Sequence, residues 1–187
     1  YFSSSRYALM TVASLVDNKY FLEECKKYKL PLILGMKMDA TAFPKEFLVD
    51  VLSYASIIFI NESECRCVCD TMNLCDITEL FNGTQAKIIV KTRGSKGSTC
   101  YYLKDGKVET VDVGIVKAER VIDTVGSGDA YLAGFLYAYF SGMSVEACAR
   151  YGATLASFIL EGMGSTSSAP DEAALKSRYV KNFGGQG

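Results

Sequence analysis

The feature that most constrains the fold is the alternation of short apolar runs with amphipathic segments along the chain. Continuous apolar runs at residues 30–36 (LPLILGM), 56–60 (SIIFI) and 87–91 (KIIVK) predict strands that are buried on both faces. Buried strands of this kind, separated by helices, are typical of a parallel sheet with helices on both sides. The sequence therefore predicts an α/β fold with a doubly wound, mainly parallel sheet.

The amphipathic segments between these runs predict helices. The expected helices lie at residues 5–16, 19–29, 45–54, 62–74, 77–81, 128–140, 144–160 and 171–179. Residues 99–103 and 107–113 alternate around the turn sequence Lys-Asp-Gly, which predicts a β-hairpin. Residues 1–187 are interpreted as one α/β domain with a frayed tail at 182–187. Because no strand precedes the first expected helix, we expect the sheet to be truncated at its N-terminal side.

Composition excludes several classes of function. The 187 residues carry a net charge of −1 and no dense Lys/Arg run, which argues against nucleic acid as a partner. The longest stretch without charge, residues 130–145, is too short and too mixed to cross a membrane. The chain begins with Tyr1, and no basic segment precedes an apolar run, so we expect a cropped or processed cytoplasmic protein without a signal peptide.

The chain contains no His, which removes Ser-His-Asp and Cys-His catalysis and makes most zinc sites unfavourable. Any general base must then be Asp, Glu, Lys, Tyr or Cys. Seven scattered Cys fit reduced thiols better than a disulfide framework. Cys65, Cys67, Cys69 and Cys75 could bind zinc, but their alternate-residue spacing differs from the usual pair, so packed or solvent-facing thiols are the preferred interpretation.

The strongest local signal is the octapeptide Asp-Thr-Val-Gly-Ser-Gly-Asp-Ala at residues 123–130, which precedes a strongly helical stretch. Gly126 and Gly128 flank the small Ser127, so backbone amides can turn toward one point without obstruction by side chains. At the start of a helix such amides form an anion site that the helix dipole reinforces. A phosphate group is the natural occupant of this site.

Asp129 lies just inside the expected helix start, where the dipole favours its ionised form. Phosphoryl transfer needs this pairing of electrostatic stabilisation at the phosphate with a base on the nucleophile. The structural alternative is a glycine-rich turn in which Asp123 and Asp129 are helix caps. A Gly-x-Gly pair alone is weak, whereas both Asp residues at this spacing favour the functional interpretation.

This octapeptide resembles the D-T-x-G-A-G-D signature of the ribokinase-like (PfkB) carbohydrate and nucleoside kinases, with Ser127 in place of the commoner Ala. The resemblance implies an ATP-dependent phosphotransferase that moves the γ-phosphate to a hydroxyl of a sugar or nucleoside. It implies that Asp129 is the catalytic base and that Gly126, Ser127 and Gly128 form the anion hole.

Two further segments match the same family. Asn61 and Glu64 resemble its N-x-x-E motif, which implies that they organise Mg²⁺ and phosphate through water. Thr92, Gly94 and Gly97 resemble its T-x-G-x-x-G nucleotide loop, which implies close approach of the backbone to ATP. Without the resemblance, the first segment reads as a polar helix start and the second as a β-turn.

The late loop at residues 162–170 occupies the place where family members close over adenine, which implies a role for Gly164 in nucleotide binding. Some members also bind a monovalent cation between such a loop and the first Asp of the signature, here Asp123; a plain helix connector is the alternative. The resemblance covers residues 31–179 with its motifs in order. The family's Gly-Gly segment, early Asp and β lid have no counterpart, which leaves open the substrate and the activity of this chain alone.

Two other functions are weighed against a kinase. A nucleotide-binding module without catalysis fits the missing substrate region. A dinucleotide-binding Rossmann protein is disfavoured, because Gly-x-Gly comes late in the chain and Tyr131 stands where a third Gly would be. Residues 122–136 lean toward an adenosine kinase, and a homodimer is left open.

An aromatic stripe follows the signature, and its helical spacing is typical of core packing rather than of a ligand site. Its members are Tyr131, Phe135, Tyr137, Tyr139 and Phe140.

Overall fold

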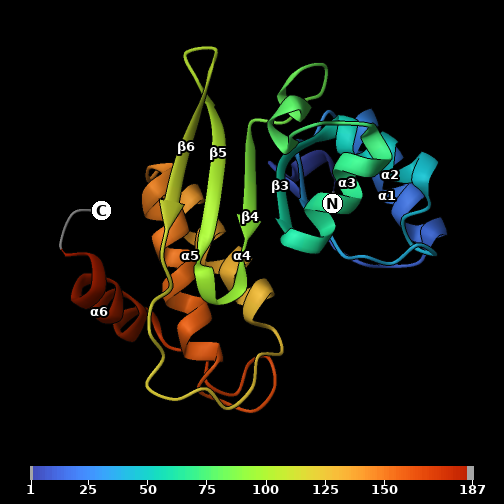
Figure 1. Cartoon of the computed structure of the whole chain (residues 1–187). Coiled ribbons are helices and arrows are strands. Elements are labelled where there is room, and N and C mark those ends of the chain that lie inside the picture. Colours follow the sequence, from blue (N-terminus) through green and yellow to red (C-terminus); the bar gives the residue numbers. More distant parts are fainter. Residues whose placement is uncertain (1, 185–187) are drawn as a thin grey trace. The chain divides into compact units, whose positions relative to one another are not determined.

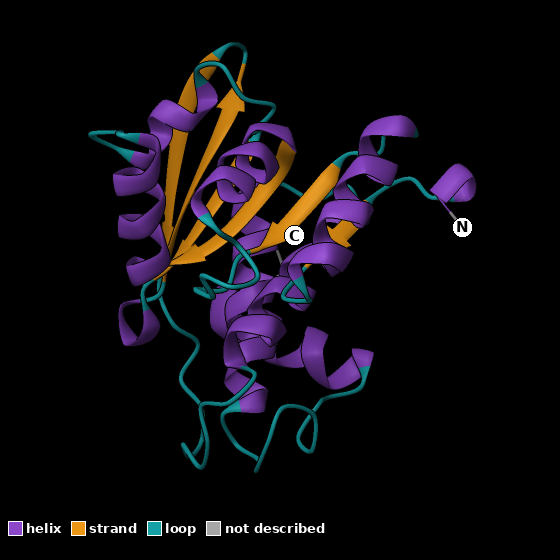
Figure 2. Cartoon of the chain, turned by 90° about the vertical axis from the view of Figure 1, so that its right-hand side faces the viewer, coloured by secondary structure: helices purple, strands orange, loops and turns teal. Residues whose placement is uncertain are grey.

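The computed structural model describes residues 2–184 and forms one six-stranded sheet in the order β1-β2-β3-β4-β5-β6. The chain divides into two compact units. The first unit comprises residues 1–92 and 101–110, and the second comprises residues 93–100 and 111–187. Strands and helices alternate over residues 8–92, after which two strands and then three helices follow one another (Figure 1). Figure 2 shows the strands in orange and the helices in purple. The prediction of an α/β fold with a mainly parallel sheet is confirmed.

The first unit contains four parallel strands and the helices that connect them (Figure 1). The strands are β1 (Ala8–Met10), β2 (Leu32–Gly35), β3 (Ala55–Asn61) and β4 (Ile88–Thr92), and the helices are α1 (Leu15–Lys27), α2 (Lys45–Tyr54), α3 (Glu62–Met72) and the 3₁₀-helix η2 (Ile77–Phe81). All four residues of β2 and the first six residues of β3 are buried. This is the burial expected for central strands covered on both faces.

The helix predicted at residues 5–16 is wrong. A short strand, β1, occupies its middle, where Ala8 pairs with Leu32 of β2 in parallel register. Ala8 and Met10 are buried while Leu9 between them is exposed, which is the two-residue period of a strand. The first long helix begins only at residue 15, after Ser14 caps it by accepting a hydrogen bond from the amide of residue 17. The first helix is therefore preceded by a strand, contrary to expectation.

The hairpin predicted after β4 is confirmed. It consists of β5 (Ser98–Lys104) and β6 (Lys107–Val113), and both strands are divided between the two units. Asp105 and Gly106 form its two-residue turn and both have positive φ, +50° and +74°. Positive φ at both central positions is the geometry of the tight turn that suits the twist of paired strands.

The second unit contains three helices, α4 (Ser127–Phe140), α5 (Val145–Ile159) and α6 (Glu172–Phe183). Helices α4 and α5 pack closely because glycine faces backbone at their crossing. A Cβ at Gly134 would lie 2.6 Å from the carbonyl oxygen of Tyr151, and one at Gly152 would lie 2.8 Å from that of Tyr131. Neither contact leaves room for any side chain.

The remaining expectations for local structure hold with small shifts at the ends of elements. Of the aromatic stripe, Tyr131 and Phe135 are buried in α4 as predicted, whereas Phe140 is 49% exposed. The frayed tail was placed too early, because α6 continues to Phe183, and residues 185–187 lie outside the described part. Among the described helices, none combines the length and the apolar character that crossing a membrane requires.

Candidate functional site

The glycine-rich turn lies in the second unit and begins helix α4. Gly126 is the N-cap residue and has a φ of +80°, in the left-handed region that favours glycine. A Cβ at this position would lie 2.5 Å from the Cβ of Ser165 in the late loop. The turn therefore requires glycine for two independent reasons, its backbone conformation and the close approach of the late loop.

The amides at the start of α4 are only partly used within the protein. Gly126 provides no side chain to cap the helix, and the amide of Ser127 donates to the carbonyl of Thr124 over 3.2 Å. Gly128 is exposed, and the hydrogen bonds of the described residues include none from its amide. Asp129 follows in the first turn of the helix and is also exposed. An anion at this helix start would find at least one amide available and the dipole favourable.

Asp123 connects the turn to the late loop. Its Oδ1 accepts a hydrogen bond from the amide of Val125 over 3.0 Å, and its Oδ2 accepts one from the amide of Gly164 over 2.9 Å. These two backbone donors hold the pKa of the Asp123 carboxyl below its usual range. The structure therefore brings together Asp123 and Gly164, two residues that the sequence placed in one cation or nucleotide site.

The nucleotide loop is braced by strand β6. Gly97 has a φ of +84°, and a Cβ there would lie 2.1 Å from the carbonyl oxygen of Val113. Asp112, the neighbour of Val113, accepts hydrogen bonds at Oδ1 from Arg93 over 2.9 Å and from Thr99 over 2.6 Å. Within the loop, residues Gly94–Lys96 form the 3₁₀-helix η3, which lies between Arg93 and Gly97. The loop is thus a tight, supported turn, and glycine at its end permits the contact with β6.

A buried pair joins the end of this loop to helix α4. The hydroxyl groups of Ser98 and Tyr131 lie 2.7 Å apart, and both residues belong to the second unit. The sequence had assigned Tyr131 to core packing, which its burial confirms, but sequence reasoning missed the hydrogen bond. No spacing signal could have identified it, because the partners are 33 residues apart and belong to different elements.

The N-x-x-E residues lie in the first unit, at the start of α3. Asn61 accepts hydrogen bonds at Oδ1 from the amides of Ser63 and Glu64, both over 2.9 Å, and its own amide donates to Glu64 Oε2 over 2.7 Å. This reciprocal arrangement is a capping box. The local geometry is therefore that of the polar helix start that the sequence offered as the alternative. Asn61 also pairs in register with Thr92, so the ends of β3 and β4 bring two predicted site residues side by side.

The predicted Mg²⁺ ligands can be tested against their chemistry. Asn61 and Glu64 supply amide and carboxylate oxygens, the donor type that Mg²⁺ prefers through its bound water. Glu64 is buried and uses Oε2 for the Asn61 amide. The oxygen donors of these two residues, which both belong to the first unit, therefore fit water-mediated Mg²⁺.

The cysteine cluster shows no metal-binding geometry in the described chain, where no three His, Cys, Asp or Glu residues converge. Cys65 is buried in α3, Cys67 and Cys69 are half-buried, and Cys75 is exposed. Burial raises the pKa of the Cys69 thiol to about 11, with a further contribution from Cys65. The Cys65 and Cys69 thiols are therefore protonated near neutral pH.

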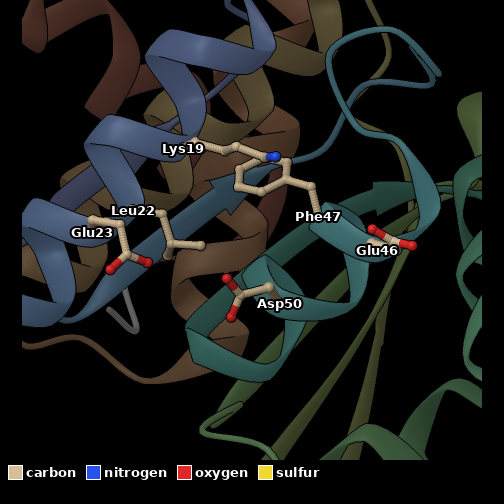
Figure 3. A pocket seen from close by; sticks show the side chains of 6 residues that line it. All are labelled: Lys19, Leu22, Glu23, Glu46, Phe47 and Asp50. Atoms are coloured by element: carbon tan, nitrogen blue, oxygen red, sulfur yellow. The ribbon is translucent and has the colours of Figure 1, made fainter.

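A surface groove lies between α1 and α2 in the first unit, away from these motifs (Figure 3). Figure 3 shows Lys19 beside the ring of Phe47, with acidic side chains around them. Two carboxylates of the groove, those of Glu23 and Asp50, form ion pairs with Lys26 over 3.0 and 2.9 Å. The groove contains none of the predicted site residues.

Comparisons with known proteins agree with the motifs. The family described as pfkB family carbohydrate kinase matches residues 23–172. A nucleoside kinase of Methanocaldococcus jannaschii is 36% identical over 144 residues, which are 77% of this chain and 45% of that protein.

Solved structures give the same result. The crystal structure of M. jannaschii nucleoside kinase, described as an archaeal member of the ribokinase family, has a TM-score of 0.81 at 28% identity, covering 95% of this chain and 56% of that one. Burkholderia thailandensis nucleoside kinase in complex with ADP-inosine has a TM-score of 0.85 at 25% identity, covering 98% and 56%. The chain spans about half the length of the proteins that it matches.

Proposed function

Because the chain belongs to the pfkB family of carbohydrate kinases, we propose that it is the nucleotide-handling part of an ATP-dependent kinase. The enzyme would transfer the γ-phosphate of ATP to a hydroxyl group of a nucleoside or sugar. The observation that carries this proposal is the start of α4, where a glycine N-cap leaves the helix without a side-chain cap and Asp129 follows within one turn. An anion site next to a carboxylate is what phosphoryl transfer to an alcohol requires.

The proposed reaction is an in-line displacement. The substrate hydroxyl oxygen forms a bond to the γ-phosphorus while the bond to the bridging oxygen of ADP breaks, and Asp129 accepts the hydroxyl proton. Backbone amides of Gly126, Ser127 and Gly128 face the negative charge that the migrating phosphoryl group carries. The Ser127 amide has a weak internal partner at 3.2 Å, which an anion with more negative charge can replace.

The nucleotide itself would lie against Thr92, Gly94, Gly97 and Gly164, where positive φ at the last three lets backbone approach phosphate or adenine. Mg²⁺, when bound, neutralises phosphate charge and aligns the γ-phosphate.

The protein groups that would hold Mg²⁺ are Asn61 and Glu64, acting through water. A monovalent cation near Asp123 would add to the two amides that already face this carboxylate. Both ions would act at the ends of secondary-structure elements, where backbone dipoles and carboxylates are available together.

A nucleoside is the favoured acceptor. The support is that the M. jannaschii relative is a nucleoside kinase and that the B. thailandensis structure holds ADP-inosine. The experiment is to incubate the full-length protein with Mg²⁺·ATP and a panel of inosine, adenosine, cytidine, ribose and fructose, and to measure ADP formation and the phosphorylated product. Turnover with a nucleoside or sugar supports a kinase, and the preferred acceptor identifies the class. Binding of Mg²⁺·ATP without transfer to any acceptor would favour the non-catalytic module.

A further inference from the structure

We propose that the hydrogen bond between Ser98 and Tyr131 is a positioning contact, which holds the nucleotide loop at a fixed place relative to the start of α4. The inference rests on the proposed kinase function and adds two residues that touch neither ATP nor the acceptor. Ser98 and Tyr131 would act through their neighbours, the loop that ends at Gly97 and the helix turn that contains Asp129.

The pair is completely enclosed. Ser98 has no exposed surface, Tyr131 is 6% exposed, and their oxygens lie 2.7 Å apart. Breaking such a bond leaves a buried hydroxyl group without a partner, which is costly because water cannot replace the lost interaction. Burial also raises the pKa of the Tyr131 phenol well above its usual range, so the phenol is protonated near neutral pH.

The covalent paths from this bond to the site are short. Ser98 is the first residue of β5 and directly follows Gly97, the last glycine of the nucleotide loop. Tyr131 follows Asp129 by two residues in α4, which is a rise of about 3 Å along the helix axis. Because only one or two residues separate each partner from the site, a shift of Ser98 or Tyr131 changes the position of the nucleotide loop relative to Asp129.

The tyrosine ring is held from behind as well. A Cβ at Gly152 of α5 would lie 2.9 Å from Cε1 and 3.0 Å from Cδ1 of Tyr131, so the α5 backbone lies directly against the ring. The ring of Tyr131 is therefore in contact with the α5 backbone, and its hydroxyl group is hydrogen-bonded to Ser98 of β5. Together these contacts hold α4 at a fixed distance from β5.

The test replaces one hydroxyl group at a time in the full-length protein. Tyr131→Phe keeps the ring and removes its hydrogen bond, and Ser98→Ala removes the other partner. We expect each variant to lower kcat for phosphoryl transfer about tenfold, because misalignment of reacting groups by a fraction of an ångström is enough for this loss. The dissociation constant of Mg²⁺·ADP should change less than about twofold, since the loop keeps its own braced shape. The double variant should lose no more than either single one, because both remove the same contact.

The matched control is Tyr151→Phe, which removes the hydroxyl group of another buried tyrosine in the second unit, stacked on Tyr179. It should keep the kcat of the unchanged protein. A normal kcat in both Tyr131→Phe and Ser98→Ala would overturn the positioning role. An equal loss of kcat and of ADP affinity together with a lower Tm would also overturn it, because that result indicates general destabilisation. If Tyr131→Phe does not fold, Ser98→Ala decides by the same readouts. Absence of transfer by the unchanged protein would instead contradict the proposed kinase function.

Discussion

Two helices of this protein begin at predicted site residues, and their first turns are built in opposite ways. Helix α3 begins with a complete capping box, in which Asn61 and Glu64 satisfy each other's backbone amides. Helix α4 begins at Gly126, which has no side chain to offer, and the adjacent Gly128 is exposed. The first arrangement stabilises the helix from within, and the second leaves backbone donors for a ligand.

The difference teaches that a helix start can contribute to a phosphate site in two ways. An uncapped start, such as that of α4, has backbone amides with which an anion can interact directly, and the helix dipole would then act on that anion. A capped start, as in α3, uses its amides internally and can contribute only through side-chain oxygens that remain outside the cap. The proposed function gives direct phosphate stabilisation to α4 and indirect, water-mediated metal organisation to α3, and four predictions test this proposal.

The largest expected effect is at Asp129. In the full-length protein, Asp129→Asn should lower kcat by about 10³-fold, because an amide cannot accept the hydroxyl proton and general-base catalysis is worth 10²–10⁴. Thermal unfolding should change little, since Asp129 is exposed. The control is Asp171→Asn at the N-cap of α6, because Asp and Asn are both good N-cap residues. Transfer by Asp129→Asn at the normal rate would remove this residue as the base.

The next effect concerns the turn itself. Gly126→Ala should lower kcat/KM for ATP about 10- to 100-fold, since a positive φ and a contact at 2.5 Å with Ser165 force the turn to move. The matched control is Gly142→Ala in the α4–α5 connection. Its φ is +77°, but nothing lies within 4 Å of the added Cβ. Both variants should lose about 1 kcal/mol from left-handed strain, so an equal loss of activity in both would refute a specific role for the turn.

A tenfold effect is expected at α3. Glu64→Gln preserves the capping box, because Gln can also accept from the Asn61 amide, but removes the charge. The Mg²⁺ concentration for half-maximal rate should rise about tenfold, as expected when an outer-shell partner of a metal is changed.

The chain offers a close control for this change. Glu79 of η2 completes a second capping box, with Asp76, in the same unit. Glu79→Gln should leave the Mg²⁺ requirement unchanged. If the two variants behave alike, α3 contributes only a helix cap and the N-x-x-E motif has no metal role here.

Much of the fold was predictable because burial on both faces is recorded in continuous apolar runs. The runs around Ile58 and Ile89 gave β3 and β4 within about a residue of their observed ends. The strand Ala8–Met10 was missed because it has only three residues, and its neighbouring sequence also fits a helix. Its conformation is determined by pairing with β2, 24 residues away, which no local pattern reports.

The site was predictable where a local rule operates and hidden where tertiary contacts operate. Glycine at position 126 follows from the positive φ of a tight turn, and Asn61 at a helix start follows from capping preference. The contact of Asp123 with Gly164 and that of Ser98 with Tyr131 join separate elements. Such contacts depend on how α4, β5 and the late loop pack, and only the three-dimensional structure provides them.

The smallest expected effect is a pH dependence at Asp123. The amides of Val125 and Gly164 hold the pKa of this carboxyl below its ordinary value of 3.8 in the folded protein. A depressed pKa means that the contribution to stability is complete above about pH 4 and is lost as the pH falls through the folded value. Asp123→Asn should therefore reduce the drop in Tm between pH 5 and pH 3, as measured by thermal unfolding at each pH. An unchanged dependence of Tm on pH in Asp123→Asn would show that the position of the late loop does not depend on this carboxylate. The hydrogen bond from Gly164 to Asp123 would then not be what connects the late loop to the turn that begins α4.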